Sequence, residues 1–287
     1  MKISVGVFFG GKTVEHEVAI ISALQAIRNF NKEKYDIVPV YMSREGKFYT
    51  GSALMDIDNY SDMNTLTSNI REVVLVASPN NCVDLFQYPF KWRKKPLATI
   101  ELAFPVVHGT NVEDGTLQGY LKTLGVPLAG PGVTASAIGM DKYASKALFR
   151  DAGLPVVHGL RFTANEFVKN PDKVIAMLEW KLPYPMIVKP LDLGSSVGVG
   201  LAKDKRELHD AIENAAEYSS LLLAEAAVTK LREINCSVLG DRDGAEASEC
   251  EEPLGSAQIL SYEDKYAGGD GGSKGMSSLK RLLPAPI

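Results

Sequence analysis

The chain opens with a pattern that fixes much of its architecture: a short apolar run, a pair of glycines and a segment with helical spacing. Residues 3–9 read ISVGVFF, are rich in strand-forming residues and end at Gly10 and Gly11. After the glycines, apolar residues recur at the spacing of one helix face, at Val14, Val18, Ile21, Leu24 and Ile27. A strand, a turn and a helix in this order predict an α/β domain.

Two further segments extend this prediction. Residues 35–43 (YDIVPVYMS) and 100–109 (IELAFPVVHG) are strand-like, and each ends in polar or glycine residues where a parallel sheet presents its loops. We therefore predict an open, parallel-sheet, Rossmann-like domain over residues 1–130. The proline- and glycine-rich turn GVPLAGPG closes it.

The sequence after residue 130 predicts a different arrangement of helices and strands. Residues 135–152 have helical character, and strand-like segments then alternate with one charged helix from about 204 to 217. This order is typical of an α+β arrangement. The segment 267–275, AGGDGGSKG, is rich in glycine, which has the most backbone freedom to lose on ordering, and we expect a flexible loop there.

Composition excludes several classes of protein. The formal net charge is −4 and the 31 basic residues are scattered, which argues against a nucleic-acid partner. The three cysteines, Cys82, Cys236 and Cys250, are odd in number and widely spaced, so neither a disulfide framework nor a zinc site is indicated, and a reducing cytoplasm fits best. We see no signal peptide and no apolar run approaching the roughly 20 residues of a membrane span.

One motif formally matches a phosphate-binding loop. Residues 6–13, GVFFGGKT, satisfy the pattern GxxxxGK[ST], in which Lys12 would contact nucleotide phosphates. In such a loop the spacer residues curl around the anion, whereas Val7, Phe8 and Phe9 have the character of a buried strand. A phosphate-loop NTPase using Lys12 therefore stays as the less favoured alternative.

Polar residues gather where the first domain's strands end. Glu15 follows the glycine turn at a helix start, where the helix dipole and a strand's carboxyl end face a cleft, and a carboxylate there can bind a ligand amine. His108 ends another apolar strand and precedes the run EDGTLQG at 113–119. Taken with GGKTVEHEV at 10–18 and SAIGMDKYASK at 136–146, this run resembles the D-alanine:D-alanine ligases of the ATP-grasp superfamily.

In the second part of the chain, a lysine and a glycine-rich loop indicate a binding site for nucleotide phosphates. Lys189 closes the apolar strand PMIVKP, where a lysine needs an anionic partner, and GSSVGVG follows, whose backbone N–H groups can approach phosphate closely. The resemblance implies that Lys142 and Lys189 contact ATP phosphates and that His108 binds substrate. It also implies that Ser195 joins the substrate network and that a lid includes Gly194, Ser196 and Gly198.

Two acids follow in LLLAEAAVTKLREINCSVLG. By resemblance, Glu225 accepts a hydrogen bond from the adenine amino group and Glu233 binds the ribose hydroxyls. Glu233 and Asn235, on a predicted strand, would point two oxygen donors to one face, as a Mg²⁺ site requires. The family's metal pair lies beyond the element that matches residues 265–266, so we assign Glu233 to ribose.

The segment SYEDKY at 261–266 is the last strong match. By resemblance, Lys265 lies near ATP, while Tyr266 hydrogen-bonds with Ser195 and Glu15 to order the substrate site. The acid cluster at 246–252 has no role in this resemblance and is typical of a solvated hairpin.

The resemblance implies ATP-dependent ligation of two D-alanines through a D-alanyl phosphate, for peptidoglycan and cell-wall synthesis in the cytoplasm. It implies ATP and Mg²⁺ (or Mn²⁺) as cofactors, a homodimer, and an ATP-grasp fold divided into a central part, 131–225, and a C-terminal part, 226–287. The loops 194–200 and 267–275 are the expected lid, which excludes water from the acyl phosphate.

Family members continue beyond the position that matches residue 287, with the arginine and the Mg²⁺ ligands. We therefore expect an incomplete C-terminal part without metal ligands. A catalytically incomplete, nucleotide-binding fragment stays open as an alternative. The second substrate, D-alanine, D-serine or D-lactate, also stays open.

Overall fold

The computed structural model describes residues 2–90, 95–241, 243–254 and 281–287. The chain divides into two compact units: one takes in residues up to 156 together with 191–194, and the other takes in 157–190 and the residues from 195 on. The boundaries predicted near 130 and 225 concern family subdomains, and they stay predictions.

The first unit is built on a seven-stranded mixed sheet with the order β6-β5-β4-β3-β2-β1-β7. The strands are β1 (Ile3–Gly10), β2 (Tyr35–Met42), β3 (Phe48–Thr50), β4 (Arg71–Ser78), β5 (Cys82–Gln87), β6 (Ala98–Ile100) and β7 (Leu102–Pro105). Strand β1 is parallel to β2 and β7, as predicted, whereas β3 to β6 pair antiparallel. Short connections such as residues 43–47 allow only antiparallel pairing, because a parallel pair needs a long crossover.

The two ends of this sheet are joined through one residue. Strands β6 and β7 are the terminal strands of the sheet, yet only Glu101 separates them in the chain. Ser4 of β1 meets this junction: its N–H donates to the Glu101 carboxylate (2.8 Å), its Oγ donates to the Thr99 carbonyl (2.6 Å), and its carbonyl accepts from the Glu101 N–H (2.9 Å). The sheet therefore curls until its edges adjoin.

The helices in the described part of the first unit are α1 (His16–Asn29), α2 (Met63–Asn69), α3 (Thr116–Thr123), α4 (Val133–Met140) and α5 (Lys142–Asp151), with 3₁₀ turns at Ser52–Met55, Ile57–Ser61 and Pro79–Asn81. Alternate residues of β1 belong to two different hydrophobic cores. Phe9 packs in the core that contains α1, and Phe8 packs in the core that contains α3. This alternation follows from the two-residue period of a strand.

The single helix predicted over 135–152 is two helices. Asp141 has extended backbone angles (φ −80°, ψ 102°), and its side chain accepts hydrogen bonds from the backbone N–H groups of Tyr143 and Ala144. Aspartate is a favoured N-cap, so it ends one helix and starts the next. The periodicity of apolar residues alone did not reveal this break.

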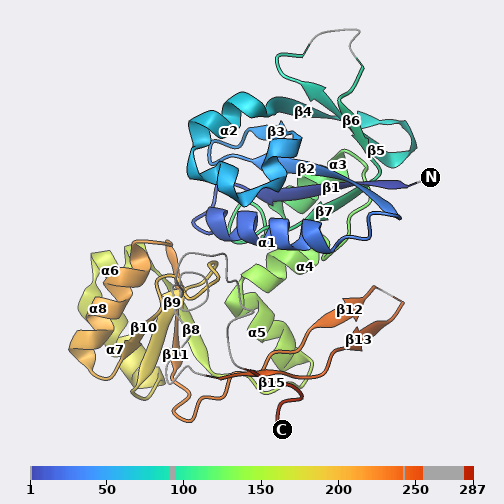
Figure 1. Cartoon of the computed structure of the whole chain (residues 1–287). Helices are drawn as coiled ribbons and strands as arrows, with labels where there is room; N and C mark the ends of the chain where they lie inside the picture. The colour runs from blue at the N-terminus through green and yellow to red at the C-terminus, as the bar shows by residue number, and fades with distance from the viewer. Residues whose placement is uncertain (1, 91–94, 242, 255–280) are drawn as a thin grey trace. The chain divides into compact units, whose positions relative to one another are not determined.

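The second unit contains a four-stranded antiparallel sheet with the order β10-β9-β11-β8. Its strands are β8 (Gly159–Thr163), β9 (Met186–Pro190), β10 (Gly200–Ala202) and β11 (Leu221–Ala226). Helices α6 (Ala164–Lys169), α7 (Pro171–Lys181) and α8 (Lys205–Ala216) cover one face (Figure 1). Met186, Val188, Leu222 and Ala224 form the core beneath them, which leaves the alternate residues of β9 and β11 on the other face.

Beyond Ala226 the described chain forms two small antiparallel pairs, β12 (Val238–Gly240) with β13 (Ala245–Ala247) and β14 (Glu252–Pro253) with β15 (Arg281–Leu282). The hairpin is exposed along β12 and β13, as expected for the acid cluster. The strand predicted through Glu233 is wrong, because Glu233 pairs with no strand. The first pairing after it is an isolated bridge between Asn235 and Glu251. Among the described residues, no helix combines the length and the apolarity that a membrane crossing requires.

Candidate functional site

The phosphate-loop alternative is wrong for this structure. Residues 6–10 of the motif are part of strand β1, and Val7, Phe8 and Phe9 are buried. A residue in a strand cannot curl around an anion, and Lys12 is exposed beyond the strand's end. The motif match is therefore a coincidence of a strand followed by a glycine turn.

Glu15 lies at the turn between β1 and α1. It is the N-cap residue of α1, but its side chain makes no capping hydrogen bond, and the whole residue is only 2% exposed. Its N–H lies 3.3 Å from the Thr13 Oγ1, which accepts from it. The carboxylate therefore serves some purpose other than capping its own helix.

His16 is fixed in one tautomer by its two neighbours. Its Nδ1 lies 2.7 Å from the carbonyl oxygen of Gly11, which can only accept, so Nδ1 carries the proton. Its Nε2, 3.0 Å from the Tyr41 hydroxyl, then accepts from that hydroxyl. Burial lowers the pKa of His16, against the opposing effect of the Gly11 hydrogen bond, and burial raises the pKa of Tyr41 to about 12. The ring is a neutral support for the turn that holds Glu15.

Two glycines allow backbone to approach the Glu15 carboxylate. A Cβ on Gly109 would lie 2.8 Å from the Glu15 Oε2 and 2.1 Å from the Thr13 Oγ1, and Gly109 has a φ of +88°. A Cβ on Gly194 would lie 3.3 Å and 3.4 Å from the two carboxylate oxygens. Glu15 therefore lies against two loops that are distant in sequence, and both carry glycine at the contact.

The loop after β7 satisfies its own backbone. The Glu113 carboxylate accepts from the Gly109 N–H (2.8 Å), and the Asp114 carboxylate accepts from the N–H groups of Asn111 (2.8 Å) and Thr116 (3.1 Å). The acids of the EDGTLQG run therefore shape the loop.

His108 and Arg44 border this turn. His108, predicted to bind substrate, has its Nε2 2.9 Å from the Ser22 Oγ on α1. Arg44 donates from Nη1 to the Thr13 carbonyl (3.1 Å) and from Nη2 to the Glu17 carboxylate (2.5 and 2.7 Å). The first unit thus gathers Glu15, His16 and His108 with a cation and several hydroxyl groups around the carboxyl end of β1.

Lys142 lies at the first position of α5. Its Nζ donates to the backbone carbonyls of Leu193 and Leu191 (3.2 Å for the latter), and the Lys142 N–H also meets the Leu191 carbonyl at 3.3 Å. An ammonium at a helix N-terminus is disfavoured by the dipole, and these carbonyls offset that effect. Lys142, which was predicted to contact ATP phosphates, therefore contacts the segment that leads into the glycine-rich loop.

Lys189 and Glu225 form an ion pair in the second unit. Lys189 of β9 is directly opposite Leu223 in the antiparallel register, so Glu225, two residues further along β11, is on the same face. This face is the one that α6 to α8 leave uncovered. Glu225 is on an inner strand and only 4% exposed, so it is not a surface acid.

The segment that follows β9 is a tight loop. Ser195 and Ser196 have left-handed backbone angles (φ 49° and 61°), which are uncommon for residues with a side chain, and Gly198 has a φ of 68°. A Cβ on Gly198 would lie 2.9 Å from both Pro190 and Tyr218. Residues other than glycine in left-handed conformations cluster at active sites and ligand-binding segments, which makes the loop a functional candidate.

Other predicted residues are not gathered in this way. Glu233 is in an irregular segment after β11, with its Oε2 buried and without a hydrogen bond. Lys265 and Tyr266 lie outside the described residues, as does the predicted loop 267–275.

The described residues contain one group with the spacing of a metal site. His209, Asp210 and Glu213 lie close together on α8. This helix packs on the core face of the sheet, opposite Lys189, and its Asp210 and Glu213 already contact Arg206 and His209. An imidazole-containing, ion-paired group on that side does not fit the oxygen-only site that Mg²⁺ prefers beside nucleotide phosphates.

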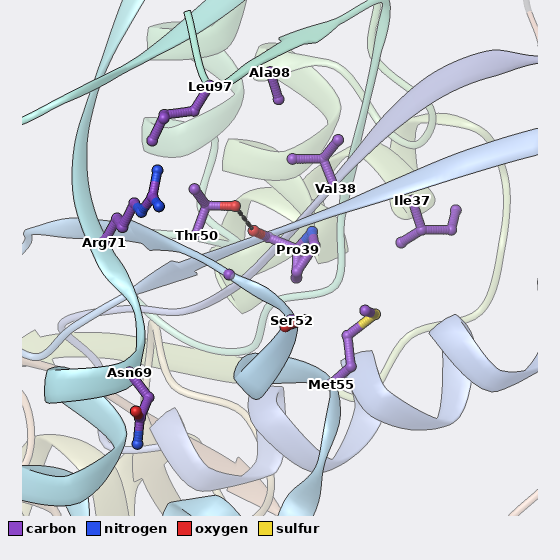
Figure 2. A pocket seen from close by; sticks show the side chains of 11 residues that line it. Ile37, Val38, Pro39, Thr50, Ser52, Met55, Asn69, Arg71, Leu97 and Ala98 are labelled. Atoms are coloured by element: carbon purple, nitrogen blue, oxygen red, sulfur yellow. Dashed lines mark hydrogen bonds between the residues drawn. The ribbon is translucent and has the colours of Figure 1, made fainter.

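A separate pocket of about 470 Å³ lies along the first half of β2 (Figure 2). Thr50 donates from Oγ1 to the Pro39 carbonyl (2.7 Å) in its wall, and Arg71 lies beside Thr50 on the neighbouring strand β4. The pocket is lined by Ile37, Val38, Pro39, Thr50, Gly51, Ser52, Met55, Asn69, Arg71, Leu97 and Ala98. No predicted site residue is among them, so the pocket is distinct from the candidate site.

Comparison with known proteins decides the family. The family model described as D-ala D-ala ligase N-terminus matches residues 4–131, and the one described as D-ala D-ala ligase C-terminus matches residues 148–281. The chain belongs to the D-alanine–D-alanine ligase family. This family comprises ATP-dependent enzymes that form a D-alanyl dipeptide for peptidoglycan synthesis and generally use Mg²⁺.

Individual relatives agree with the family models. D-alanine–D-alanine ligase of Chloroherpeton thalassium is 38% identical over 294 residues, covering 100% of this chain and 75% of the relative. The ligase of Chlorobium phaeovibrioides is 35% identical over 273 residues, covering 92% and 72%. Each comparison spans most of this chain and about three quarters of the relative.

Solved structures of the family share the fold. VanG D-Ala:D-Ser ligase from Enterococcus faecalis superposes with a TM-score of 0.75 at 28% identity, covering 100% of this chain and 78% of that one. The D-alanine–D-alanine ligase from Coxiella burnetii gives 0.73 at 28%, covering 88% and 71%. The ATP-grasp fold predicted from the sequence is confirmed.

Two residues that contact the site's histidines were not predicted from the sequence. They are Tyr41, which contacts His16, and Ser22, which contacts His108. A signal for Tyr41 was available, because β1 and β2 are parallel and Tyr41 is opposite Phe9 near their carboxyl ends. Side chains at the same end of neighbouring parallel strands meet. Ser22 carried no such signal, because its contact with His108 depends on how α1 packs.

Proposed function

We propose that this chain joins two D-alanines with ATP through a D-alanyl phosphate and that Glu15 binds the ammonium group of the substrate. The observation that carries this proposal is the buried Glu15 carboxylate held against Gly109 and Gly194. A cation beside a buried carboxylate is favourable, and the amino group of D-alanine is a cation of suitable size. The bound amine would thereby be oriented for reaction.

ATP phosphates are the proposed partners of Lys142 and Lys189. Lys189 carries three N–H donors and Glu225 occupies part of that capacity, so the ammonium can also donate to a phosphate oxygen. Glu225 would accept from the adenine amino group and Glu233 from the ribose hydroxyls, with Lys265 also near ATP. These roles are supported by the family's motif at these positions, and for Glu225 by its burial on the uncovered face of the sheet.

The proposed reaction has two steps. A D-alanine carboxylate oxygen attacks the γ-phosphorus and ADP leaves; the amine of the second D-alanine then attacks the acyl carbon, and phosphate leaves. Lysine cations stabilise the charge on the transferring phosphoryl group, and Ser195 and Tyr266 would position the substrate with Glu15. Mg²⁺ bound to ATP supplies further charge neutralisation; no described residues fit it beside Lys189, and no step is assigned to it.

Exclusion of water is the proposed role of the loop 194–200. An acyl phosphate hydrolyses if water reaches it, so the loop must cover it during the reaction. The left-handed residues Ser195, Ser196 and Gly198 support this role. We expect ATP with D-alanine to protect the loop from proteolysis, and continued cleavage with both bound would contradict the lid.

A coupled assay tests the function. The purified chain is given ATP, Mg²⁺ and D-alanine, and ADP and dipeptide are measured together. We expect ADP release that depends on D-alanine, and a loss of at least about tenfold in kcat/KM in Glu15→Gln and in Lys189→Ala. The matched controls are Glu33→Gln and Lys203→Ala, which alter exposed side chains and should keep full activity. ATP binding without dipeptide would contradict the proposed ligation.

D-Alanine is also the proposed second substrate. Curated relatives that are 33% to 38% identical are named D-alanine–D-alanine ligases, whereas the D-Ala:D-Ser ligase structure is 28% identical. A competition assay with D-alanine, D-serine and D-lactate should yield mainly D-alanyl-D-alanine. We also propose a homodimer, which sedimentation at several protein concentrations would test.

A further inference from the structure

Two cysteines, Cys236 and Cys250, lie on the two limbs of the segment that carries the hairpin β12–β13. Asn235 and Glu251 form an antiparallel bridge in which each N–H donates to the other's carbonyl, at 2.8 and 2.9 Å. Continuing this register by one residue places Cys236 opposite Cys250. In antiparallel chains the pair next to a hydrogen-bonded pair is the close one, with Cα atoms typically about 4.5 Å apart.

The side chains confirm this register. The Cys250 thiol lies close enough to Cys236 for that neighbour to raise its pKa, after the larger effect of burial, and both cysteines are free in this structure. The Cys236 Sγ also lies 3.4 Å from the Ser248 carbonyl. A Cα separation of about 4.5 Å falls within the range of roughly 4.4 to 6.8 Å that disulfides require. The geometry needed for a bond therefore exists before any bond forms.

A β-bulge beside the pair holds it in place. Beyond the cysteines, Val238 is opposite Ala247, so the register has shifted by one residue and Glu249 is the extra residue. The Ser237 N–H donates to the Ser248 Oγ (2.9 Å), and the Ser237 carbonyl accepts from the Ser248 N–H (2.8 Å). Hydrogen bonds on both sides of the cysteines therefore limit slippage of one limb along the other.

We propose that Cys236 and Cys250 are a reversible oxidation site at which a hydroperoxide converts the two thiols into a cross-strand disulfide. Cys236 is exposed and Cys250 half-buried, so Cys236 meets the oxidant first. Burial, and then the neighbouring Cys236, raise the pKa of Cys250, which keeps it a thiol until its partner is oxidised. This assigns Cys236 as the attacking residue and Cys250 as the resolving one.

The reaction balances with one hydroperoxide. The Cys236 thiolate attacks one peroxide oxygen, the O–O bond breaks, and a sulfenic acid forms as the peroxide takes up the proton and leaves as water or alcohol. The Cys250 sulfur then attacks the Cys236 sulfur, the S–O bond breaks, and hydroxide leaves with the proton from Cys250 as water. Two thiols lose two electrons and the peroxide gains them. A dithiol reductant reverses the change.

The disulfide would close the two limbs of this segment near Glu233, the proposed ribose ligand three residues before Cys236. It would convert a pair held by backbone hydrogen bonds into a covalently closed loop. The proposal does not depend on the proposed function, because the thiols react whether or not the chain binds ATP.

Intact-mass analysis and thiol counting test the proposal. The folded chain is treated with hydrogen peroxide, alkylated with iodoacetamide, and digested without reduction. We expect two of the three thiols to be protected, a peptide linking Cys236 to Cys250, and full return of three thiols after dithiothreitol. Sulfinic acids without a cross-link, links to Cys82, or disulfides between chains would overturn the proposal.

Three serine variants supply the controls. Cys82→Ser should still lose two thiols on oxidation, whereas Cys236→Ser and Cys250→Ser should form no intramolecular disulfide. The exposed site of Cys236 makes Cys236→Ser a mild change, and circular dichroism checks its fold. If either of the last two variants fails to fold, peptide mapping of the unaltered chain still decides the outcome.

Discussion

Two buried carboxylates, one in each compact unit, are held by different means. Glu15 of the first unit lies at a turn whose backbone approaches it through Gly109 and Gly194. Glu225 of the second unit lies on a sheet and is matched by a cation, Lys189, on the neighbouring strand. The contacts described for the first carboxylate are close approaches of loop backbone, and the contact described for the second is an ion pair. Substitutions that change shape and substitutions that change charge should therefore affect the two regions differently.

The largest effect is expected when the charge pair is broken. Glu225→Ala leaves Lys189, whose side chain is only 22% exposed, without this carboxylate, and removing one member of a buried pair costs about 3 to 4 kcal/mol. Urea unfolding measures this loss. In the double variant Lys189→Met with Glu225→Leu no charge remains to be buried, so most of the stability should return while ATP binding stays lost. A double variant as unstable as Glu225→Ala would show that charge is not what holds this region.

The next largest loss of stability is expected when a side chain is added where loop backbone approaches Glu15 in the first unit. Gly109→Ala places a methyl group against Thr13 and Glu15 in a left-handed conformation and should cost about 2 to 3 kcal/mol. Gly46 provides the matched control, because its φ is +81° and nothing lies within 4 Å of its added Cβ. Gly46→Ala should cost only about 1 kcal/mol, as measured by urea unfolding of both variants. Equal losses would mean that backbone conformation, and not the approach to Glu15, decides the effect.

A smaller change in the free energy of unfolding is expected when the pH is lowered, because His16 beside Glu15 is then driven toward its charged form. The folded pKa of His16 lies below its ordinary value of 6.5, so below pH 6.5 the unfolded chain binds a proton that the folded chain does not. The stability from neutral His16 is present above pH 6.5 and is lost as the pH falls, by at most about 1.4 kcal/mol per pH unit, until the folded pKa is reached. Unfolding between pH 7.5 and 5 is compared for the unaltered chain and His16→Gln. Parallel curves would remove His16 as the cause.

The smallest effect is expected at the rim of the same turn. Arg44 and Glu17 form a bidentate pair whose side chains are 49% and 59% exposed. Exposed pairs contribute little, so Glu17→Gln should change the free energy of unfolding by less than about 1 kcal/mol, and less still at high salt. A larger loss that persists at 1 M salt would place the pair among the positioning elements of the Glu15 turn.

Much of this arrangement could be predicted from the sequence because it is local. The strand–turn–helix around Gly10 and Gly11, and the lysine that closes β9, follow from patterns within a few residues. The order of motifs then indicated the family, which the comparisons confirm.

What the sequence did not reveal depends on contacts between distant segments. The burial of Glu225 depends on the register of β9 against β11, and the cysteine pair depends on the register of residue 235 against 251. Glu233 was expected on a strand because its neighbours have strand propensity. Whether a strand forms depends on pairing with a neighbouring strand, which propensity does not reveal. The interruption at Asp141 was a matter of capping, which apolar periodicity does not detect.

The junction at Glu101 bears on the order in which the first unit folds. Strand β1 is the first element of the chain, and one of its partners, β7, is about one hundred residues further along. Closing so long a loop is entropically unfavourable, so the local hairpins β2–β3 and β4–β5 should form before β7 docks. When residues 98–105 take their place they cover both ends of the sheet in one event. Until then, β1 presents an unpaired edge to any other extended chain, and that interval is when the protein is most exposed to self-association.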